Sequence, residues 1–152
     1  MRAVKLFEEF VKNGTVKTIR KDEQRAKSLV IEAERKSNSL KEKLEKIGIK
    51  NENANDYIED CYDIIMLLVR SKMLLKGYNA TGQGAHEAEV SYLKQLGFGE
   101  SDVQFIDQLR YFRNGILYYG TILETEYAKK VVGFLNKIYP KLKEMCKTKE
   151  KK

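Results

Sequence analysis

The chain has 152 residues, of which 42% are hydrophobic and 34% charged, and its net charge is +7. This is the length of one domain with enough apolar content for a packed core, so disordered, collagen-like and low-complexity proteins are excluded. Ten glycines and a single proline also argue against an all-β domain, because such a domain needs a turn signal about every 8–12 residues.

Apolar residues recur at helical spacing along most of the chain. The spacing of Val4, Phe7 and Val11 predicts a short first helix that stops at Asn13-Gly14. A second helix is predicted to begin after the N-cap Asp22, to run to Ile47 and to be closed by Gly48. A third helix over residues 56–76 is apolar on all sides at its centre, which is typical of the most buried helix of a domain.

Three further helices are expected after a glycine-rich break at residues 77–84. The fourth covers residues 85–96. Capping-box sequences at residues 101–104 and 121–124 predict the starts of the fifth and sixth helices. Pro140 is expected to kink the last helix or to end its regular part.

Short loops between long amphipathic helices favour antiparallel neighbours. We therefore predict an all-α fold, an up-and-down bundle of five to six helices, in a single domain at residues 1–146 with a basic, disordered tail at residues 147–152. The apolar runs are too short to cross a membrane and the first residues lack a signal-peptide pattern, so we expect a cytoplasmic protein with no membrane partner. Cys61 and Cys146 have no metal-ligand spacing and are expected in the core, and neither a metal nor a cofactor is expected.

The positive charge lies at the two ends of the sequence. Residues 1–52 carry +5 and residues 141–152 carry +4, whereas residues 53–140 carry −2. A basic balance permits binding to nucleic acid or to an acidic partner. The alternative is that the charge serves only solubility.

The fifth helix carries the most informative stretch. At about 100° per residue, one face collects a carboxylate, two guanidinium groups, an amide and a phenol, namely Asp107, Arg110, Arg113, Asn114 and Tyr118. Gly115 beside them is consistent with the close approach of another backbone or a ligand. The other face is expected to be the core side and carries Phe105, Leu109, Phe112, Ile116, Tyr119 and Leu123. The polar face is either a site for phosphate chemistry or an ordinary solvated face with an Asp107–Arg110 pair.

Arg113-Asn114, three further residues and then Tyr118-Tyr119-Gly120 resemble the signature of the HEPN superfamily. These small helical-bundle domains carry, in a late helix, an Arg, a polar residue and then a His four to six residues after the Arg. The layout of the chain is similar throughout, and the resemblance implies a homodimer whose Arg and His cleave RNA without a metal at a cleft between two protomers. It also implies a minimal nucleotidyltransferase as the partner in a toxin–antitoxin pair.

Tyr118 stands where the family has its His. Cleavage needs a group that takes the 2′-hydroxyl proton and another that steadies the phosphate. Arg113 and Arg110 suit the second task because a guanidinium matches phosphate oxygens, and Asn114 could position a phosphate or a ribose hydroxyl. A phenol stays protonated at neutral pH, so Tyr118 is a poor general base and catalysis is uncertain.

The single histidine, His86, follows the glycine-rich break at the start of the fourth helix. It is either a displaced general base that reaches the Arg113 face and helps to bind phosphate, or a partly exposed residue of an ordinary first turn. We therefore expect a HEPN-like domain that interacts with nucleic acid or nucleotides, as a degenerate ribonuclease or a toxin–antitoxin component. The alternatives are a non-enzymatic protein-interaction or dimerisation module and, less favoured, a helical DNA-binding regulator.

Overall fold

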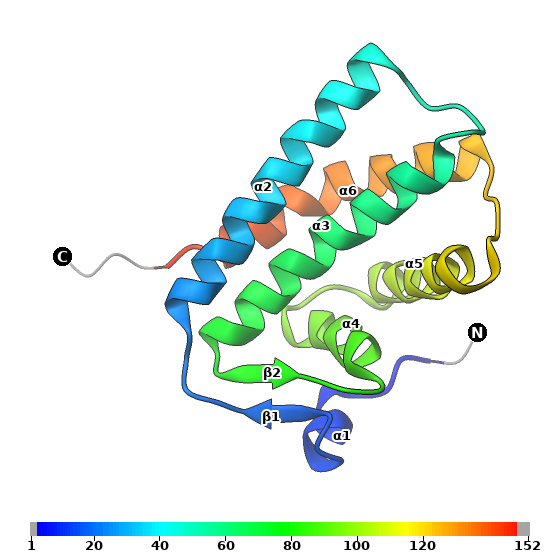
Figure 1. Cartoon of the computed structure of the whole chain (residues 1–152). Helices are drawn as coiled ribbons and strands as arrows, with labels where there is room; N and C mark the ends of the chain where they lie inside the picture. The colour runs from blue at the N-terminus through cyan, green and yellow to red at the C-terminus, as the bar shows by residue number, and fades with distance from the viewer. Residues whose placement is uncertain (1–2, 149–152) are drawn as a thin grey trace.

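The computed structural model describes residues 3–148 as six helices and a two-stranded sheet (Figure 1). Residues 149–152, which belong to the expected basic tail, lie outside the described part of the chain. The all-α bundle predicted from the sequence is confirmed. In chain order its elements are α1 Phe7–Lys12, β1 Val16–Thr18, α2 Glu23–Lys46, α3 Ala54–Leu75, β2 Tyr78–Ala80, α4 Ala85–Gln95, α5 Glu100–Tyr119 and α6 Thr125–Met145.

The ends of α2 follow from local sequence. Asp22 is the N-cap, and its carboxylate accepts a hydrogen bond from the backbone N–H of Arg25 at 3.0 Å. The helix ends at Lys46, after which Gly48 adopts a positive φ of 76° and donates its N–H to the carbonyl of Lys43. Both ends confirm the sequence prediction because these caps involve only residues a few positions apart.

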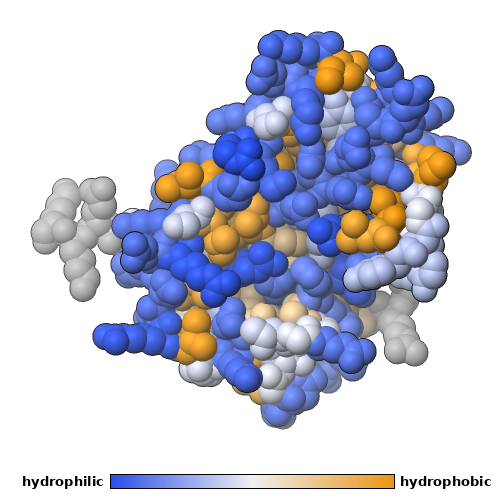
Figure 2. All heavy atoms as spheres, viewed as in Figure 1, coloured by the Kyte–Doolittle hydropathy of each residue, from blue (hydrophilic) through white to orange (hydrophobic). Residues whose placement is uncertain are grey.

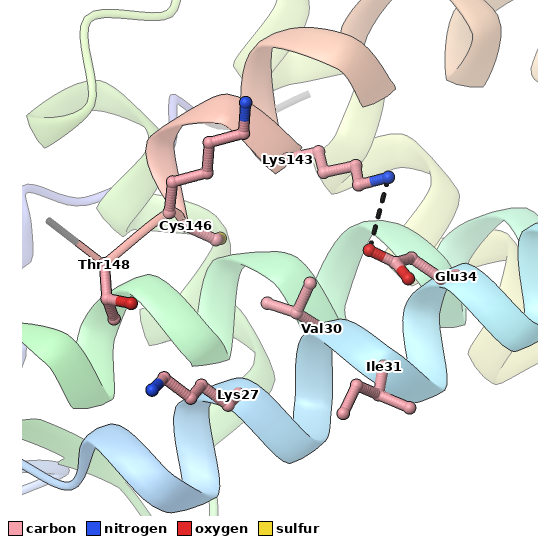
Figure 3. Close-up of a pocket in the computed structure, with 8 residues that line it drawn as sticks. Lys27, Val30, Ile31, Glu34, Lys143, Cys146 and Thr148 are labelled. Atoms are coloured by element: carbon pink, nitrogen blue, oxygen red, sulfur yellow. Dashed lines mark ion pairs between the residues drawn. The ribbon is translucent and has the colours of Figure 1, made fainter. Parts of the chain in front are cut away.

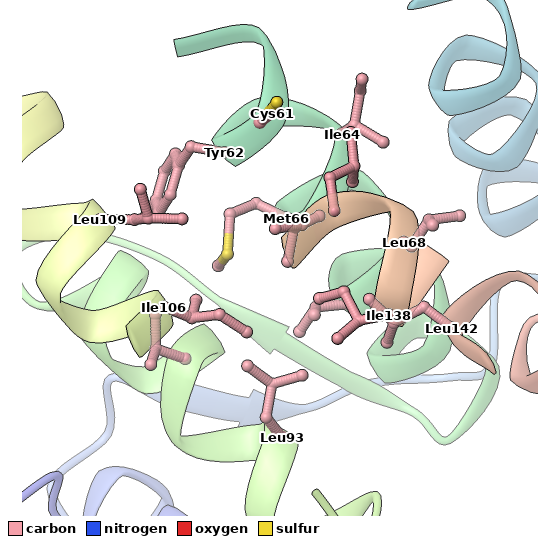
Figure 4. Close-up of a cluster of buried hydrophobic side chains, with 14 of the residues drawn as sticks. Cys61, Tyr62, Ile64, Met66, Leu68, Leu93, Ile106, Leu109, Ile138 and Leu142 are labelled. Carbon is pink, nitrogen blue, oxygen red and sulfur yellow. The ribbon is translucent and has the colours of Figure 1, made fainter. Parts of the chain in front are cut away.

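Helix α3 is the centre of the molecule. It packs against α2, α4, α5 and α6, so nearly all of its circumference is covered, as its apolar composition predicts. At the end of α6, Cys146 is buried beside α2 and donates its thiol to the carbonyl of Leu68 in α3 (Figure 3). Figure 4 shows the core where α3, α4, α5 and α6 meet, including Tyr62, Met66, Leu93, Ile106, Leu109, Ile138 and Leu142.

Both capping-box predictions were wrong. Helix α5 begins at Glu100, one residue before the first box, and its N-cap Gly99 has no side chain to offer. Helix α6 begins at Thr125, after the second box, and its first N–H is instead bound by the side chain of Asn51 at 3.3 Å. A helix start capped by a distant asparagine cannot be read from neighbouring residues.

Two further features complete the fold. Strands β1 and β2 pair antiparallel, with Val16 opposite Ala80, and this short sheet was not expected from the sequence. Pro140 does not end α6, which continues to Met145.

Within residues 3–148, none of the helices combines the length and apolar character needed to span a membrane. Hydrophilic side chains cover much of the surface over α2 (Figure 2).

Candidate functional site

Helix α5 is turned differently about its axis from the sequence prediction. Its fully buried apolar residues are Val103, Ile106 and Leu109, whereas Phe112 is half-buried and Tyr119 is 86% exposed. Since Val103 and Ile106 lie on the side that carries the arginines, that side faces α3 and α4 rather than solvent. The expected core face was therefore only partly right, and the polar residues lie at a contact between helices.

Arg113 joins α5 to α3. Its Nη2 lies 3.1 Å from Oδ1 of Asp63, and its guanidinium carbon lies 5.3 Å from the centre of the Tyr62 ring. The Arg113 side chain is 23% exposed, so both contacts are only partly open to water. Its Nε is buried and has no hydrogen-bond partner among residues 3–148. A buried donor without an acceptor is costly, so the guanidinium is held but not fully satisfied.

Arg110 lies about one turn before Arg113. Its Nε donates to Oδ1 of Asp107 at 2.9 Å, which confirms the Asp107–Arg110 pair expected from the sequence. Arg110 also lines a cavity of about 690 Å³ between the N-terminal segment, α4 and α5. The cavity walls are formed by Ala3, Val4, Lys5, Glu87, Asp107, Gln108, Arg110, Tyr111 and Phe112.

Arg70 and Glu89 form the most buried ion pair of the site. Nε and Nη2 of Arg70 donate to the two carboxylate oxygens of Glu89 at 2.6 and 3.0 Å, and the Glu89 side chain is only 3% exposed. Nδ1 of His86 lies 3.5 Å from the same carboxylate. Burial by itself would raise the pKa of Glu89, but the contacts with His86 and Arg70 outweigh it and hold that pKa below its usual value.

Tyr62 in α3 lies between these charged groups. Burial raises the pKa of the Tyr62 phenol well above its ordinary value, the charge of Glu89 adds to the rise, and Arg113, Arg110 and Arg70 oppose it. The Tyr62 hydroxyl is buried without a hydrogen-bond partner among the described residues. The α3–α4–α5 site is defined by these charged and polar residues together, namely Tyr62, Asp63, Arg70, His86, Glu89, Asp107, Arg110 and Arg113.

The remaining predicted site residues are placed less centrally. Asn114 is half-buried, and no hydrogen bond of its side chain is found within residues 3–148. Tyr118, in the last turn of α5, is 77% exposed. Gly115 permits the close approach expected of it, because Thr121 packs against it and a Cβ there would lie 3.2 Å from the Thr121 hydroxyl.

Four residues of the site, Tyr62, Asp63, Arg70 and Glu89, were missed by the sequence analysis. Glu89 offers the clearest signal, since it is a single carboxylate between core residues of α4, and a charge in such a run needs a partner. Arg70 gives a similar signal, because it is a charged residue directly after the apolar centre of α3. Tyr62 has no comparable signal, because a tyrosine at a core position is common.

Among the described residues, no group of three or more His, Cys, Asp or Glu side chains is arranged to hold a metal ion. Helix α3 carries several acids near its start, and burial raises the pKa of Glu59 while nearby Arg113 opposes the rise. The site can therefore act through guanidinium groups, an imidazole and carboxylates. Comparisons of the chain with protein-family models, with curated proteins and with solved structures found no match.

Proposed function

We propose that this protein is a HEPN-type domain that binds RNA or a nucleotide through phosphate groups beside the α3–α4–α5 site. The observation that carries the proposal is the position of Arg110, whose guanidinium lines a cavity of about 690 Å³. Pockets for small ligands commonly occupy about 300–1,000 Å³. The cavity is therefore large enough for a nucleotide and has a cation in its wall.

The groups around the cavity suit the parts of a nucleotide. Only Nε of Arg110 is used by Asp107, and the two Nη groups have no acceptor among residues 3–148. Such a free fork matches two phosphate oxygens. Tyr111 is an exposed aromatic ring in the same wall, on which a base can stack, and Gln108 offers an amide for hydrogen bonds to a base or sugar.

Cleavage of RNA is the finer part of the proposal. Tyr118, which stands where the family has its histidine, is 77% exposed and carries a phenol instead of an imidazole. His86 is the alternative base, because a carboxylate beside its Nδ1 would leave Nε2 free to take a proton. We propose that any cleavage by this protein depends on His86 and Arg113 and needs no metal.

Binding is tested with a trinucleotide, which is short enough to occupy one site only. Calorimetric titration of the full chain should show at least a tenfold weaker affinity for Arg110→Ala. The matched control is Arg35→Ala, which removes an exposed arginine of α2 that pairs with Glu32 of the same helix. Equal affinities of the two variants would contradict the proposal.

Cleavage is tested separately on a structured RNA in the presence of a chelator. Loss of cleavage in His86→Ala and in Arg113→Ala, with cleavage kept in Arg35→Ala, is the expected result. If the wild-type chain leaves RNA intact, Tyr118→His places the family's histidine where the resemblance puts it. Cleavage gained by that variant would support the site, and continued inertness would limit the function to binding.

A second candidate function is protein interaction through the end of α5. Leu117, Tyr118, Tyr119 and Ile122 are all exposed there, and exposed apolar groups that lie close together often mark an interface. We propose a homodimer formed through this surface, and a minimal nucleotidyltransferase as the further partner that the resemblance implies. Sedimentation of the wild-type chain and of Tyr119→Lys tests the dimer, since a lysine in the centre of the interface should shift it to monomers.

A further inference from the structure

A second charged surface lies at the opposite end of the bundle from the end of α5. The start of α2 meets the end of α3, where the N–H of Asp22 donates to the carbonyl of Leu74, and the end of α6 meets α3 where Cys146 donates to Leu68. Figure 1 shows these three helix ends on the left of the view, with the end of α5 on the right. Asn55 at the start of α3 binds the loop after α5, and it lies 19 residues before Leu74 on the same helix. At about 1.5 Å per residue, the end of α3 is therefore about 28 Å from the loop after α5.

Basic side chains from three elements gather at this end. We name it the basic end, and its described members are Arg20, Lys21, Arg25, Lys27, Lys72, Lys76, Lys143 and Lys147. Lys143 pairs with Glu34 and Lys147 with Glu144. The other six form no ion pair with any residue that the structure describes. Asp22 and Glu23 are the acids at the start of α2, and the Asp22 carboxylate is used as the helix cap.

Two of the unpaired cations, Lys72 and Lys76, lie close enough to repel one another. Burial lowers the pKa of Lys72, and the neighbouring charge of Lys76 lowers it further. Both lysines line one hollow, of about 520 Å³, together with Tyr78 and Tyr92. Like charges held together without an acid are stabilised when an anion binds between them.

A groove of about 470 Å³ continues the basic end between α2 and α6. Figure 3 shows Lys27 on the α2 side and Lys143 on the α6 side, with Val30 and Ile31 on the α2 side between them. Lys27 and Lys143 therefore flank the groove on its two sides, which is a pattern that a linear polyanion fits.

We propose that the basic end binds the phosphate backbone of a polynucleotide, independently of base sequence and of the Arg110 cavity. A polynucleotide fits better than a membrane, because helices that lie on lipid insert several large apolar side chains. Among the described residues that line the groove and the hollow, Ile31 is the exposed large apolar one. The phosphate backbone of a polynucleotide carries closely spaced negative charges, which can contact the cations of three separate elements at once.

The test uses the full chain and a fluorescent, unstructured 30-nucleotide RNA, and binding is followed by fluorescence anisotropy. The salt concentration is varied from about 50 to about 300 mM, the range over which phosphate contacts weaken. The variant combines Lys27→Gln, Lys72→Gln and Lys76→Gln. Its matched control combines Lys12→Gln, Lys41→Gln and Lys129→Gln, which removes the same charge from other parts of the surface. Circular dichroism melting confirms that both variants are folded.

The basic-end variant should bind the RNA at least tenfold more weakly, and its plot of log affinity against log salt should flatten by about 2, since each contact to a single strand contributes about 0.7. The control should change by less than twofold. Equal binding by the two variants would overturn the proposal. The proposal would also be overturned if neither variant changed the RNA affinity and the basic-end variant alone lost binding to phosphatidylserine vesicles.

The trinucleotide titration separates this proposal from the proposed function. The trinucleotide tests Arg110, whereas the variant at Lys27, Lys72 and Lys76 tests the basic end, and the Arg110 cavity shares no lining residue with the groove or the hollow of the basic end. If Arg110→Ala loses the trinucleotide but keeps the 30-nucleotide RNA, both surfaces act independently. If the basic-end variant keeps the long RNA while Arg110→Ala loses both ligands, the basic end is not a binding surface and the proposed function stands.

Discussion

Arg113 of α5 is held 3.1 Å from Asp63 of α3, and this contact decides how freely the guanidinium can bind another anion. The pair is about a quarter exposed, so a ligand phosphate would compete with the carboxylate for the same Nη2 group. The buried Nε has no acceptor among the described residues, which leaves part of the binding capacity of Arg113 unused. Asp63 therefore restrains a residue that the proposed function needs.

Removal of that restraint should strengthen phosphate binding. Asp63→Asn leaves an amide that competes weakly for the guanidinium, so the trinucleotide affinity should rise about three- to tenfold, equivalent to about 1 kcal/mol. The control is Asp60→Asn, in the same helix, whose carboxylate pairs with Lys43 instead. Calorimetric titration measures both, and an unchanged or weaker affinity in Asp63→Asn would show that Arg113 does not meet the ligand.

The Arg70–Glu89 pair should contribute strongly to stability. Glu89→Gln breaks a bidentate contact of a buried carboxylate, and we expect the free energy of unfolding to fall by about 2 kcal/mol. Urea denaturation at pH 7 measures the loss. Glu87→Gln, two residues earlier on α4, removes a carboxylate with no ion pair among the described residues and should change stability by less than about 0.5 kcal/mol.

The same pair predicts a pH dependence. The pKa of Glu89 is lowered on folding, so its contribution is complete above about pH 4.5 and is lost as the pH falls through the lowered value. The difference in stability between the wild-type chain and Glu89→Gln should therefore be largest near neutral pH and shrink at pH 3. A constant difference at both pH values would contradict this assignment.

Asn55 should hold the loop between α5 and α6. Its Nδ2 donates to the carbonyl of Thr121 at 2.8 Å, and its Oδ1 accepts the N–H of Leu123 at 3.0 Å. Asn55→Ala removes both bonds, so hydrogen exchange of residues 121–124 should become faster and stability should fall by about 1–2 kcal/mol. Asn136→Ala, an exposed change in the middle of α6, is the control and should leave exchange in this loop as it is.

Two glycines should respond in opposite directions to alanine. Gly77 has a φ of 83°, and a Cβ there would lie 2.8 Å from the backbone carbonyl oxygen of Ile19. Gly77→Ala should therefore lower the free energy of unfolding by about 2 kcal/mol or more, because backbone strain and steric overlap add together. Gly133 is inside α6 with open space around it, and Gly133→Ala should stabilise by about 0.5–1 kcal/mol. Thermal denaturation distinguishes the two, and equal midpoints would refute the assignment.

The helices could be predicted well where their ends depend on neighbouring residues. Asp22 and Gly48 cap α2 through contacts that span three to five positions, and the apolar centre of α3 is visible in the sequence alone. The starts of α5 and α6 could not be predicted in the same way. Asn51 caps α6 from 74 residues away, so its role exists only once the chain is folded.

The sequence by itself determined the all-α bundle, the buried central helix and the presence of two arginines one turn apart on α5, because periodicity and local caps act over short distances. Only the tertiary structure decided which side of α5 faces inward, since that depends on how α3 and α4 pack against it. The Arg70–Glu89 pair, 19 residues apart, and the contact of Arg113 with Asp63, 50 residues apart, arise from the same packing. The charged residues are therefore visible in the sequence, but their partners are set by long-range contacts that no local pattern encodes.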